Sequence, residues 1–227
     1  MYLKRKADAY LNAWKSDPNR SPLIIKGPRQ VGKTETIDYF AAHNYRSVVE
    51  INFVEEPKYR AITADGYGAD TIVRNISLID PAKKFIPGDT LIFFDEIQAH
   101  PDIATALKFF KIDGKYDVIC SGSMLGISYK QIESNSVGYK TDYEMRSLDF
   151  EEFLWARGYD EAVIESMFTH LCDATPFSEV EMNVFSTAFM DYCVLGGMPA
   201  VVASHIRTGT FEGTLQLQRQ LILDYQE

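Results

Sequence analysis

The segment GPRQVGKT, residues 27–34, matches the pattern GxxxxGK[ST] of a phosphate-binding loop. Gly27 and Gly32 let the backbone curl so that its N–H groups point inward toward a polyphosphate. Lys33 supplies a point charge for the β and γ phosphates, and Thr34 offers a hydroxyl to Mg²⁺, which prefers oxygen ligands. A helix expected to begin near Lys33 adds its positive end and its unpaired amides. The segment therefore predicts a P-loop, and we assign the nucleotide contacts to Gly27, Pro28, Arg29, Gln30, Val31, Gly32, Lys33, Thr34 and Glu35.

The residues on either side of the loop support this prediction. The short run 22–26 is apolar and lies between a proline and a glycine, which is typical of a strand. Residues 33–43 carry apolar side chains at helical spacing. A glycine-rich turn that joins a strand to a helix and binds no ligand is the alternative, and the order of strand, loop and helix favours the phosphate site.

A second motif, LIFFDE at residues 91–96, follows roughly 60 residues later. The run TLIFF has no polar face, which is typical of a parallel strand covered by helices on both sides. The acidic pair at its end matches a Walker B motif, in which Asp95 holds Mg²⁺ through water and Glu96 polarises the attacking water as a general base. A solvated carboxylate pair at the start of a loop is the alternative. Because the P-loop and this pair both belong at the carboxyl ends of parallel strands, each supports the other.

A third candidate lies after the buried run YDVIC, residues 116–120, which predicts another short strand. The sequence Ser121-Gly122-Ser123 follows it, so small hydroxyl groups are expected at the same sheet edge. Such a group can hydrogen-bond the γ-phosphate or the attacking water. We expect Ser121 or Ser123 to do so and prefer Ser123, which follows the glycine; a simple Ser-Gly-Ser turn is the alternative.

The composition is that of an ordinary globular protein, with 46% hydrophobic and 24% charged residues. A formal net charge of −9 offers no basic footprint for nucleic acid. No run approaches the roughly 20 apolar residues of a membrane span, and the N-terminus lacks an apolar run of signal-peptide length. The three cysteines form no CxxC pair, so they indicate neither a zinc site nor a disulfide framework, and we expect each to be a buried small hydrophobe. We therefore expect a reduced, cytoplasmic protein without a membrane partner, and its charge does not indicate nucleic acid as a partner.

The character of the chain changes near residue 148. Strands alternate with helices in residues 1–148, whereas the pattern in residues 149–227 predicts helices alone. This organisation predicts an α/β fold, in which the parallel sheet of a P-loop NTPase domain is sandwiched by helices and followed by a smaller helical lid subdomain. No stop signal follows the last helical pattern, so we expect the lid subdomain to be truncated at its C-terminus.

Individual elements can be assigned from the same patterns. In the first region we expect helices over residues 2–15, 33–43 and 103–110, and strands over residues 22–26, 47–53, 90–94, 116–120 and 139–148. Residues 56–80 predict irregular helical structure. In the second region we expect helices over residues 149–157, 160–171, 178–195 and 211–225.

Taken together, GPRQVGKT, LIFFDEIQ, a strand ending in SGS and the segment SLDFEEFLWARGY resemble the bacterial and archaeal AAA+ ATPases that are often described simply as ATP-binding proteins. The resemblance covers nearly the whole chain, and LDFEEFLWA and LGGMP point to this family in particular. It implies binding and hydrolysis of ATP with Mg²⁺. Members usually carry a C-terminal domain of unknown function that is similar to restriction-endonuclease-like folds. That domain does not occur in this sequence, so no nuclease activity is expected of it.

The resemblance also assigns roles to single residues. It makes Ser121 or Ser123 the sensor 1 residue. The segment LGGMP, residues 195–199, resembles the lid motif of related signalling ATPases, whose proline packs on the adenine; here that is Pro199, and a helix-breaking turn is the alternative. The segment LDFEEFL is expected to form an amphipathic helix with its aromatic residues in the core.

Family members usually form oligomers in which a neighbour places an arginine finger in the site, so a homo-oligomer is implied. Arg146 and Arg157 are candidates that no spacing distinguishes, and Lys140 stands where some relatives carry arginine. This departure puts finger-assisted hydrolysis in doubt for the present chain.

The leading hypothesis is therefore Mg-dependent ATP hydrolysis coupled to movement of the lid or domain. One alternative is a P-loop kinase for small molecules, against which the pair Asp95-Glu96 argues because a base aimed at water would waste ATP. Another alternative is a regulatory module that holds nucleotide with little turnover. The absence of an NKxD pattern favours ATP over GTP, and a protein partner remains unidentified.

Overall fold

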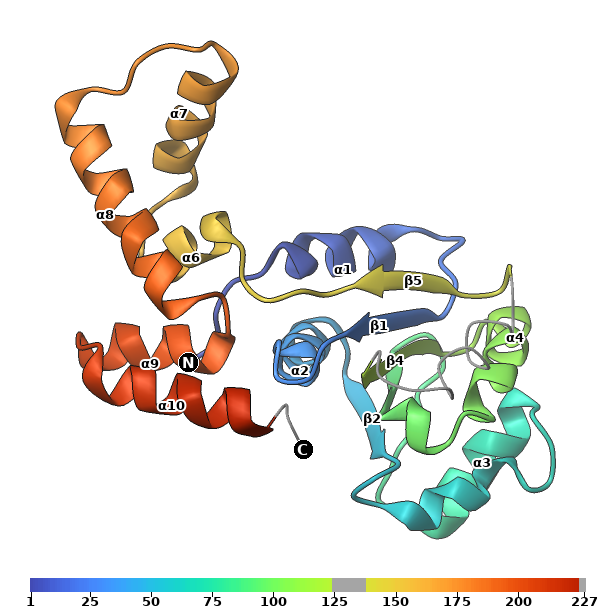
Figure 1. Ribbon diagram of the computed structural model, residues 1–227. Helices are drawn as coiled ribbons and strands as arrows, with labels where there is room; N and C mark the ends of the chain where they lie inside the picture. The colour runs from blue at the N-terminus through green and yellow to red at the C-terminus, as the bar shows by residue number, and fades with distance from the viewer. Residues whose placement is uncertain (124–137, 225–227) are drawn as a thin grey trace. The chain divides into compact units, whose positions relative to one another are not determined.

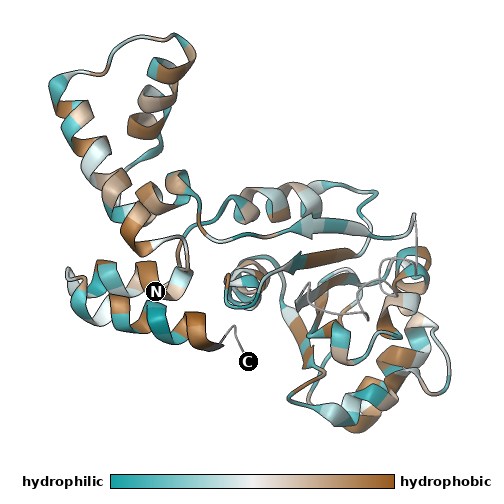
Figure 2. Cartoon of the chain, viewed as in Figure 1, coloured by the Kyte–Doolittle hydropathy of each residue, from teal (hydrophilic) through white to brown (hydrophobic). Residues whose placement is uncertain are grey.

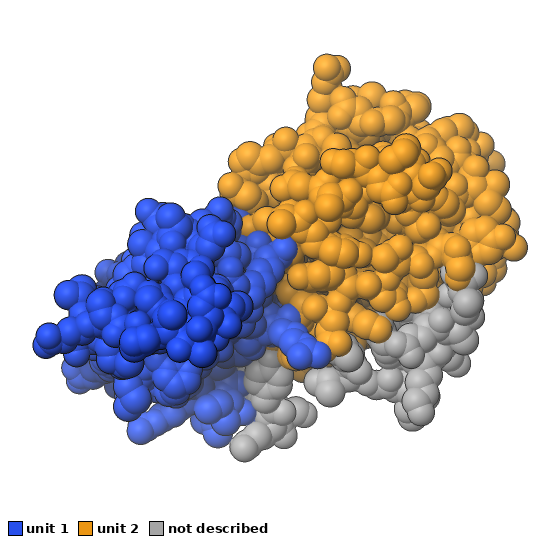
Figure 3. Space-filling view, turned by 90° about the horizontal axis from the view of Figure 1, so that it is seen from above, with its two compact units in different colours: residues 1–6, 30–32, 146–227 blue, residues 7–29, 33–145 orange. Residues whose placement is uncertain are grey.

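The computed structural model describes residues 1–123 and 138–224 (Figure 1). The chain forms two compact units, which Figure 3 shows in different colours. Unit 1 contains residues 1–6, 30–32 and 146–227, and unit 2 contains residues 7–29 and 33–145. This division follows contacts alone, so the domain boundary at residue 148 stays a prediction.

Unit 2 is built on a sheet that has five parallel strands within the described residues, in the order β2-β3-β4-β1-β5. The strands are β1 (Leu23–Gly27), β2 (Ser47–Asn52), β3 (Thr90–Asp95), β4 (Asp117–Ser123) and β5 (Thr141–Glu144). Strand β3 is buried along its whole length, which explains why its sequence has no polar face. The predicted parallel α/β sheet is confirmed.

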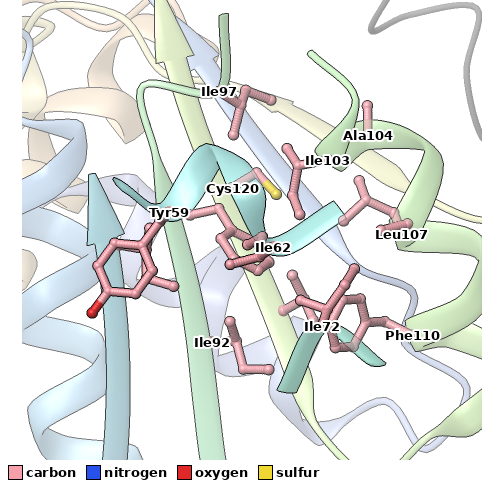
Figure 4. Packing of buried hydrophobic residues seen from close by; sticks show 14 of the residues in the cluster. Tyr59, Ile62, Ile72, Ile92, Ile97, Ile103, Ala104, Leu107, Phe110 and Cys120 are labelled. Atoms are coloured by element: carbon pink, nitrogen blue, oxygen red, sulfur yellow. The ribbon is translucent and has the colours of Figure 1, made fainter. Parts of the chain in front are cut away.

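Helices cover both faces of this sheet (Figure 1). The helical segments of unit 2 are α1 (Lys6–Ser16), α2 (Lys33–Asn44), α3 (Ala69–Ile79), α4 (Ile103–Asp113) and the short 3₁₀ helices η1 (Pro57–Thr63) and η2 (Ile97–Ala99). On one face, η1, α3 and α4 pack against strand residues in a large apolar cluster. Figure 4 shows Ile62, Ile72 and Leu107 gathered around Cys120 in this cluster. Helix α2 packs against β1 and β4.

Strand β4 is longer than the sequence pattern predicts. It continues through Ser123, because its pairing with β1 extends to the pair Gly27–Ser123. Ser121 and Ser123 are therefore strand residues and do not form the simple turn considered as an alternative. Both side chains are buried at the carboxyl-terminal end of the sheet.

Unit 1 is mainly helical. Its helices are α6 (Phe150–Ala156), α7 (Glu161–Cys172), α8 (Glu179–Leu195), α9 (Pro199–Thr208) and α10 (Glu212–Asp224). Side-chain hydrogen bonds mark the starts of α6, α7 and α8. Asp149 and Ser178 each accept a hydrogen bond from the third residue of the following helix and form a capping box. Helix α9 was not predicted, because Pro199 follows a glycine pair; as the first residue of a helix, proline forfeits no hydrogen bond.

Two further expectations concern the burial of the cysteines and the lack of a membrane-spanning segment. Cys120 is buried, but Cys172 and Cys193 are exposed, so the expectation that every cysteine is buried is wrong. Both exposed cysteines lie on helices of unit 1, on a surface that also exposes large apolar side chains. Among the helices in the described ranges, none is long and apolar enough to cross a membrane.

Gly197 is required by a close backbone contact inside unit 1. The N–H of Leu148 donates to the carbonyl of Gly197 at 2.7 Å, and a Cβ on Gly197 would lie 2.0 Å from the carbonyl oxygen of Leu148. We expect Gly197→Ala to lower the free energy of unfolding by about 2 kcal/mol or more, measured by urea denaturation followed by circular dichroism. Gly213→Ala is the matched control, because a Cβ there meets nothing within 4 Å. Equal stability of the two variants would contradict this prediction.

Candidate functional site

The P-loop joins the end of β1 to the start of α2. Gln30 and Gly32 have φ angles of 61° and 87°, in the left-handed region. Such a conformation costs a residue other than glycine about 1–2 kcal/mol, so the loop holds Gln30 in a strained conformation. Turns of this kind direct successive backbone N–H groups to one side, where they can bind an anion. The local backbone thus supports the predicted phosphate cradle.

Gly27 has a different physical role from the one that its sequence position suggests. It is not among the residues with positive φ, so the curl of the loop does not require glycine there. A Cβ on Gly27 would instead lie 2.1 Å from the carbonyl oxygen of Met145, whose N–H donates to Lys26 at 2.7 Å. The glycine therefore permits the backbone after β5 to pass close to the end of β1.

Lys33 is buried at the first position of α2. Its Nζ donates to the carbonyl oxygens of Gly27 at 3.1 Å and Pro28 at 2.7 Å. Burial lowers the pKa of Lys33, and the nearby carboxylates of Glu96 and Asp95 act in the opposite direction. The ammonium group is therefore held by loop carbonyls close to two carboxylates, where it can pair with an anionic ligand.

Asp95 stands at the centre of the site, at the end of β3. The hydroxyl of Thr34 donates to its Oδ2 at 3.1 Å, and the side chain of Asn52 donates to the same oxygen at 3.4 Å. The Oδ1 atom accepts from the backbone N–H of Glu96 at 2.9 Å and from the hydroxyl of Ser121. These donors fix the orientation of a buried carboxylate next to a hydroxyl. A hydroxyl and a carboxylate at this separation are oxygen ligands that fit Mg²⁺.

Glu96 follows directly and has an unusual backbone. Its φ and ψ angles are 54° and 46°, in the left-handed region. The side-chain amide of Gln98 donates to Glu96 Oε2. Strained conformations of non-glycine residues are frequent at functional sites, where the surrounding structure maintains them. The candidate base is thus oriented by its own backbone and by Gln98.

Gln98 itself is held close to β4. A Cβ on Gly122 would lie 2.8 Å from Gln98 Oε1, so a larger residue at that strand position would displace the Gln98 side chain. The same oxygen is buried and accepts no hydrogen bond from the described part of the chain. Gln98 was not predicted as a site residue, although it belongs to the motif LIFFDEIQ.

The two serines occupy different positions at the sheet edge. Ser121 contacts Asp95, whereas Ser123 lies two residues further along β4, opposite Gly27. Residues two apart on a strand point to the same face, so both hydroxyls lie on the same face of β4. The choice of sensor residue stays a prediction.

In unit 1, the tip of the P-loop contacts residues distant in sequence. The Cγ atom of Pro199 and Nη1 of Arg5 lie 3.6 and 3.7 Å from the position of a Cβ on Gly32. Nη1 of Arg5 also donates to the carbonyl of Val31 at 2.7 Å, and its Nε lies 3.1 Å from a carboxylate oxygen of Glu152. Pro199 thus lies beside Gly32 of the loop, and its contact with the adenine stays a prediction. Nothing in the sequence pattern indicated that Arg5 would brace the loop.

The remaining basic candidates have partners of their own. Arg157 forms an ion pair with Asp191, and Lys140 pairs with Asp142 at 2.7 Å. These contacts give neither side chain a place in the site described above, and a role of Arg146 or Arg157 as an arginine finger stays a prediction.

Comparison with known proteins finds a family model that covers the site residues of both motifs. A family model described as AAA domain matches residues 19–154, which is more than half of the chain and includes both motifs. No curated protein matches the sequence. Among solved structures, the chain is similar to PCH-2 from C. elegans, with a TM-score of 0.48 and 10% sequence identity over 92% of this chain. The match spans 63% of the PCH-2 chain, less than two thirds of its length.

Proposed function

Because this chain belongs to the AAA domain family of P-loop ATPases, we propose that it binds ATP with Mg²⁺ and hydrolyses the γ-phosphate. The observation that carries the proposal is the convergence of four groups at one sheet edge. Lys33 and Thr34 begin α2, Asp95 ends β3 and Glu96 follows it, with the hydroxyl of Thr34 only 3.1 Å from Asp95. A cation, a metal-binding pair of oxygens and a second carboxylate, oriented by Gln98, are groups that suit phosphoryl transfer to water.

Each group has a separate role in this proposal. Lys33 and the loop N–H groups hold the β and γ phosphates, and Thr34 and Asp95 hold Mg²⁺, Asp95 through water. When bound, the ion would neutralise part of the charge on those phosphates. Glu96 accepts a proton from the attacking water. Ser121 or Ser123 hydrogen-bonds the γ-phosphate or that water.

The proposal includes movement of the helical unit. Residues 30–32 belong to unit 1 by their contacts, whereas Lys33 and Thr34 belong to unit 2. Hydrolysis would remove the γ-phosphate contacts of this loop. Loss of γ-phosphate contacts is a common trigger for such rearrangements. Fluorescence energy transfer between labels on the two units, compared with ATP and with ADP, tests this part.

Pro199 provides a test of where the base binds. If its ring packs on the adenine, Pro199→Ala should weaken ATP binding about fivefold, which corresponds to roughly 1 kcal/mol of lost apolar contact. Tripolyphosphate has no base, so its affinity should not change. Calorimetry measures the affinity for both ligands. An equal loss of affinity for ATP and tripolyphosphate would mean that the substitution perturbs the loop and that Pro199 has no role in binding the base.

Hydrolysis itself is tested by measuring ADP and free phosphate with the purified chain. The proposal predicts equal amounts of both from ATP, little from GTP, and none when EDTA removes Mg²⁺. ADP without an equal amount of free phosphate would mean transfer to an acceptor, as in a kinase. Binding of ATP without turnover would contradict the proposed hydrolysis. The chain would then act as a regulatory module that binds nucleotide.

A further inference from the structure

Unit 1 carries an open apolar groove of about 530 Å³ between α6, α7 and α8. Its walls include Phe150, Met167, Phe168, Leu171, Phe185 and Phe189. Three of these, Leu171, Phe189 and Phe168, have exposed fractions of 61%, 49% and 42%. Figure 2 shows hydrophobic residues along α7 and α8, the helices that form much of the groove. Exposed apolar surfaces of this kind are typical of binding sites for other proteins.

A second, smaller pocket of about 340 Å³ adjoins this groove. Glu151 and Phe168 line both cavities. The second pocket also contains Trp155, Glu161 and Glu165. Three carboxylates and an indole ring make a site for a lysine or arginine side chain, which can pair with the acids and lie over the ring.

The N-terminal segment already shows that this edge binds ammonium groups. Lys4 pairs with Glu161, and its Nζ lies 4.6 Å from the centre of the Trp155 ring. Lys6 pairs with Glu151 at 2.7 Å. Both lysines are substantially exposed, so each pair contributes at most about 1 kcal/mol and can be exchanged for a competing cation.

The segment of the chain that supplies most of the groove is strongly acidic. The segment 149–195 contains ten Asp and Glu residues against one basic residue, Arg157, which gives a formal charge of −9 with histidine neutral. The whole chain also has a net charge of −9, so the rest of the chain is neutral in sum. A partner for this surface must therefore combine apolar side chains with positive charge.

We propose that this groove binds an amphipathic helix of a partner protein, with large apolar residues along one face and lysine or arginine beside it. The apolar face would fill the larger groove, and a basic side chain would enter the acidic pocket at one end. Recognition of amphipathic helices by apolar grooves follows this pattern, with anchors one and two helical turns apart. The proposal does not depend on ATP hydrolysis, because none of the groove residues belongs to the nucleotide site.

A designed peptide can serve as the probe. We choose a fluorescein-labelled helix of about 18 residues, long enough for five turns, with leucine on one face and lysine on the other. One control peptide carries glutamate in place of lysine, and another carries alanine in place of leucine. We expect the leucine–lysine peptide to bind the full chain at least tenfold more tightly than either control, measured by fluorescence anisotropy.

Variants of the chain locate the binding site. Leu171→Ser removes an exposed groove residue, and Glu165→Lys reverses a charge in the acidic pocket; each is expected to weaken binding of the leucine–lysine peptide at least fivefold. Met190→Ser is the matched control, because Met190 is 63% exposed on α8 but does not line the groove. It should bind the peptide as the original chain does. Circular dichroism checks that every variant is folded.

Three outcomes would overturn the proposal. Equal binding of the leucine–glutamate peptide would mean that the surface is merely adhesive to apolar helices. Equal weakening by Met190→Ser would place the peptide elsewhere. A dimer mass in light scattering that Leu171→Ser reduces to that of a monomer would show that a second copy of this chain covers the groove.

Discussion

Replacing Glu96 with glutamine is expected to lower kcat for ATP hydrolysis about 100-fold or more, while the Kd for Mg·ATP changes less than about threefold. The amide of glutamine cannot take a proton from water at neutral pH. Its oxygen can still accept the hydrogen bond that Gln98 donates to Glu96, so the loop geometry should be kept. Steady-state phosphate release gives kcat, and calorimetry gives Kd.

Glu55→Gln is the control for this experiment, because Glu55 is an exposed acid just after β2 with no place in the proposed reaction. Its kcat should match that of the original chain. If Glu96→Gln turns over ATP at the original rate, Glu96 is not the base. If the original chain already has a negligible rate that the substitution leaves unchanged, the chain acts as a nucleotide-dependent module.

Replacing Lys33 with alanine is expected to weaken ATP binding at least about 100-fold, the largest effect on affinity that we predict. A charge-assisted contact to phosphate is strong in a buried site, and Lys33 is the buried cation at the start of α2. Its burial already imposes a desolvation cost that lowers its pKa, so removing it should not unfold the chain. Calorimetric titration with Mg·ATP measures the loss.

Lys84→Ala serves as the comparison for Lys33, since Lys84 is exposed and its Nζ bonds only the carbonyl of Pro81 among the contacts described. The affinity of this variant for Mg·ATP should remain unchanged. A Lys33→Ala chain that is folded by circular dichroism and binds ATP normally would contradict the assigned role.

Sequence patterns predicted the parts of the site that lie within single motifs. The P-loop residues and the pair Asp95-Glu96 have fixed spacing along the chain, because one strand or one loop positions each set. The structure places Thr34 within hydrogen-bonding distance of Asp95. This proximity was expected only because functional residues of parallel sheets gather at the carboxyl ends of the strands. The apolar run TLIFF also predicted a buried strand correctly. Its sequence has no polar face because β3 is buried on both faces of the sheet.

Contacts between motifs were not predictable from spacing. Asn52 reaches Asp95 because β2 pairs with β3 in a register that sets these two residues opposite one another. No local sequence pattern gives the strand order that brings these two residues together. The polar residue at the end of β2 was the one signal in the sequence that could have marked Asn52 as a site residue. Gln98 depends on the close approach that Gly122 permits, and Arg5 depends on tertiary contacts with Val31 and Glu152.

The helix α9 shows a different limit of sequence reasoning. Gly196 and Gly197 were interpreted as a break with Pro199 at its end, whereas the proline begins a helix of ten residues. The sequence Gly-Gly-Met-Pro is compatible with the end of one helix and with the start of the next. Proline is excluded from helix interiors but favoured in the first turn of a helix. The structure places Pro199 at the first position of α9, where its missing N–H forfeits no hydrogen bond.

The most direct measurement is isothermal titration of ATP into the folded chain, with Mg²⁺ and again with EDTA. If Lys33, Thr34 and Asp95 form a site for Mg·ATP, the titration should show one site per chain. Removing the metal should weaken binding at least tenfold, because the oxygen pair of Thr34 and Asp95 then loses its bridge to the phosphates. A chain with normal circular dichroism that takes up no ATP in the presence of Mg²⁺ would contradict the assignment.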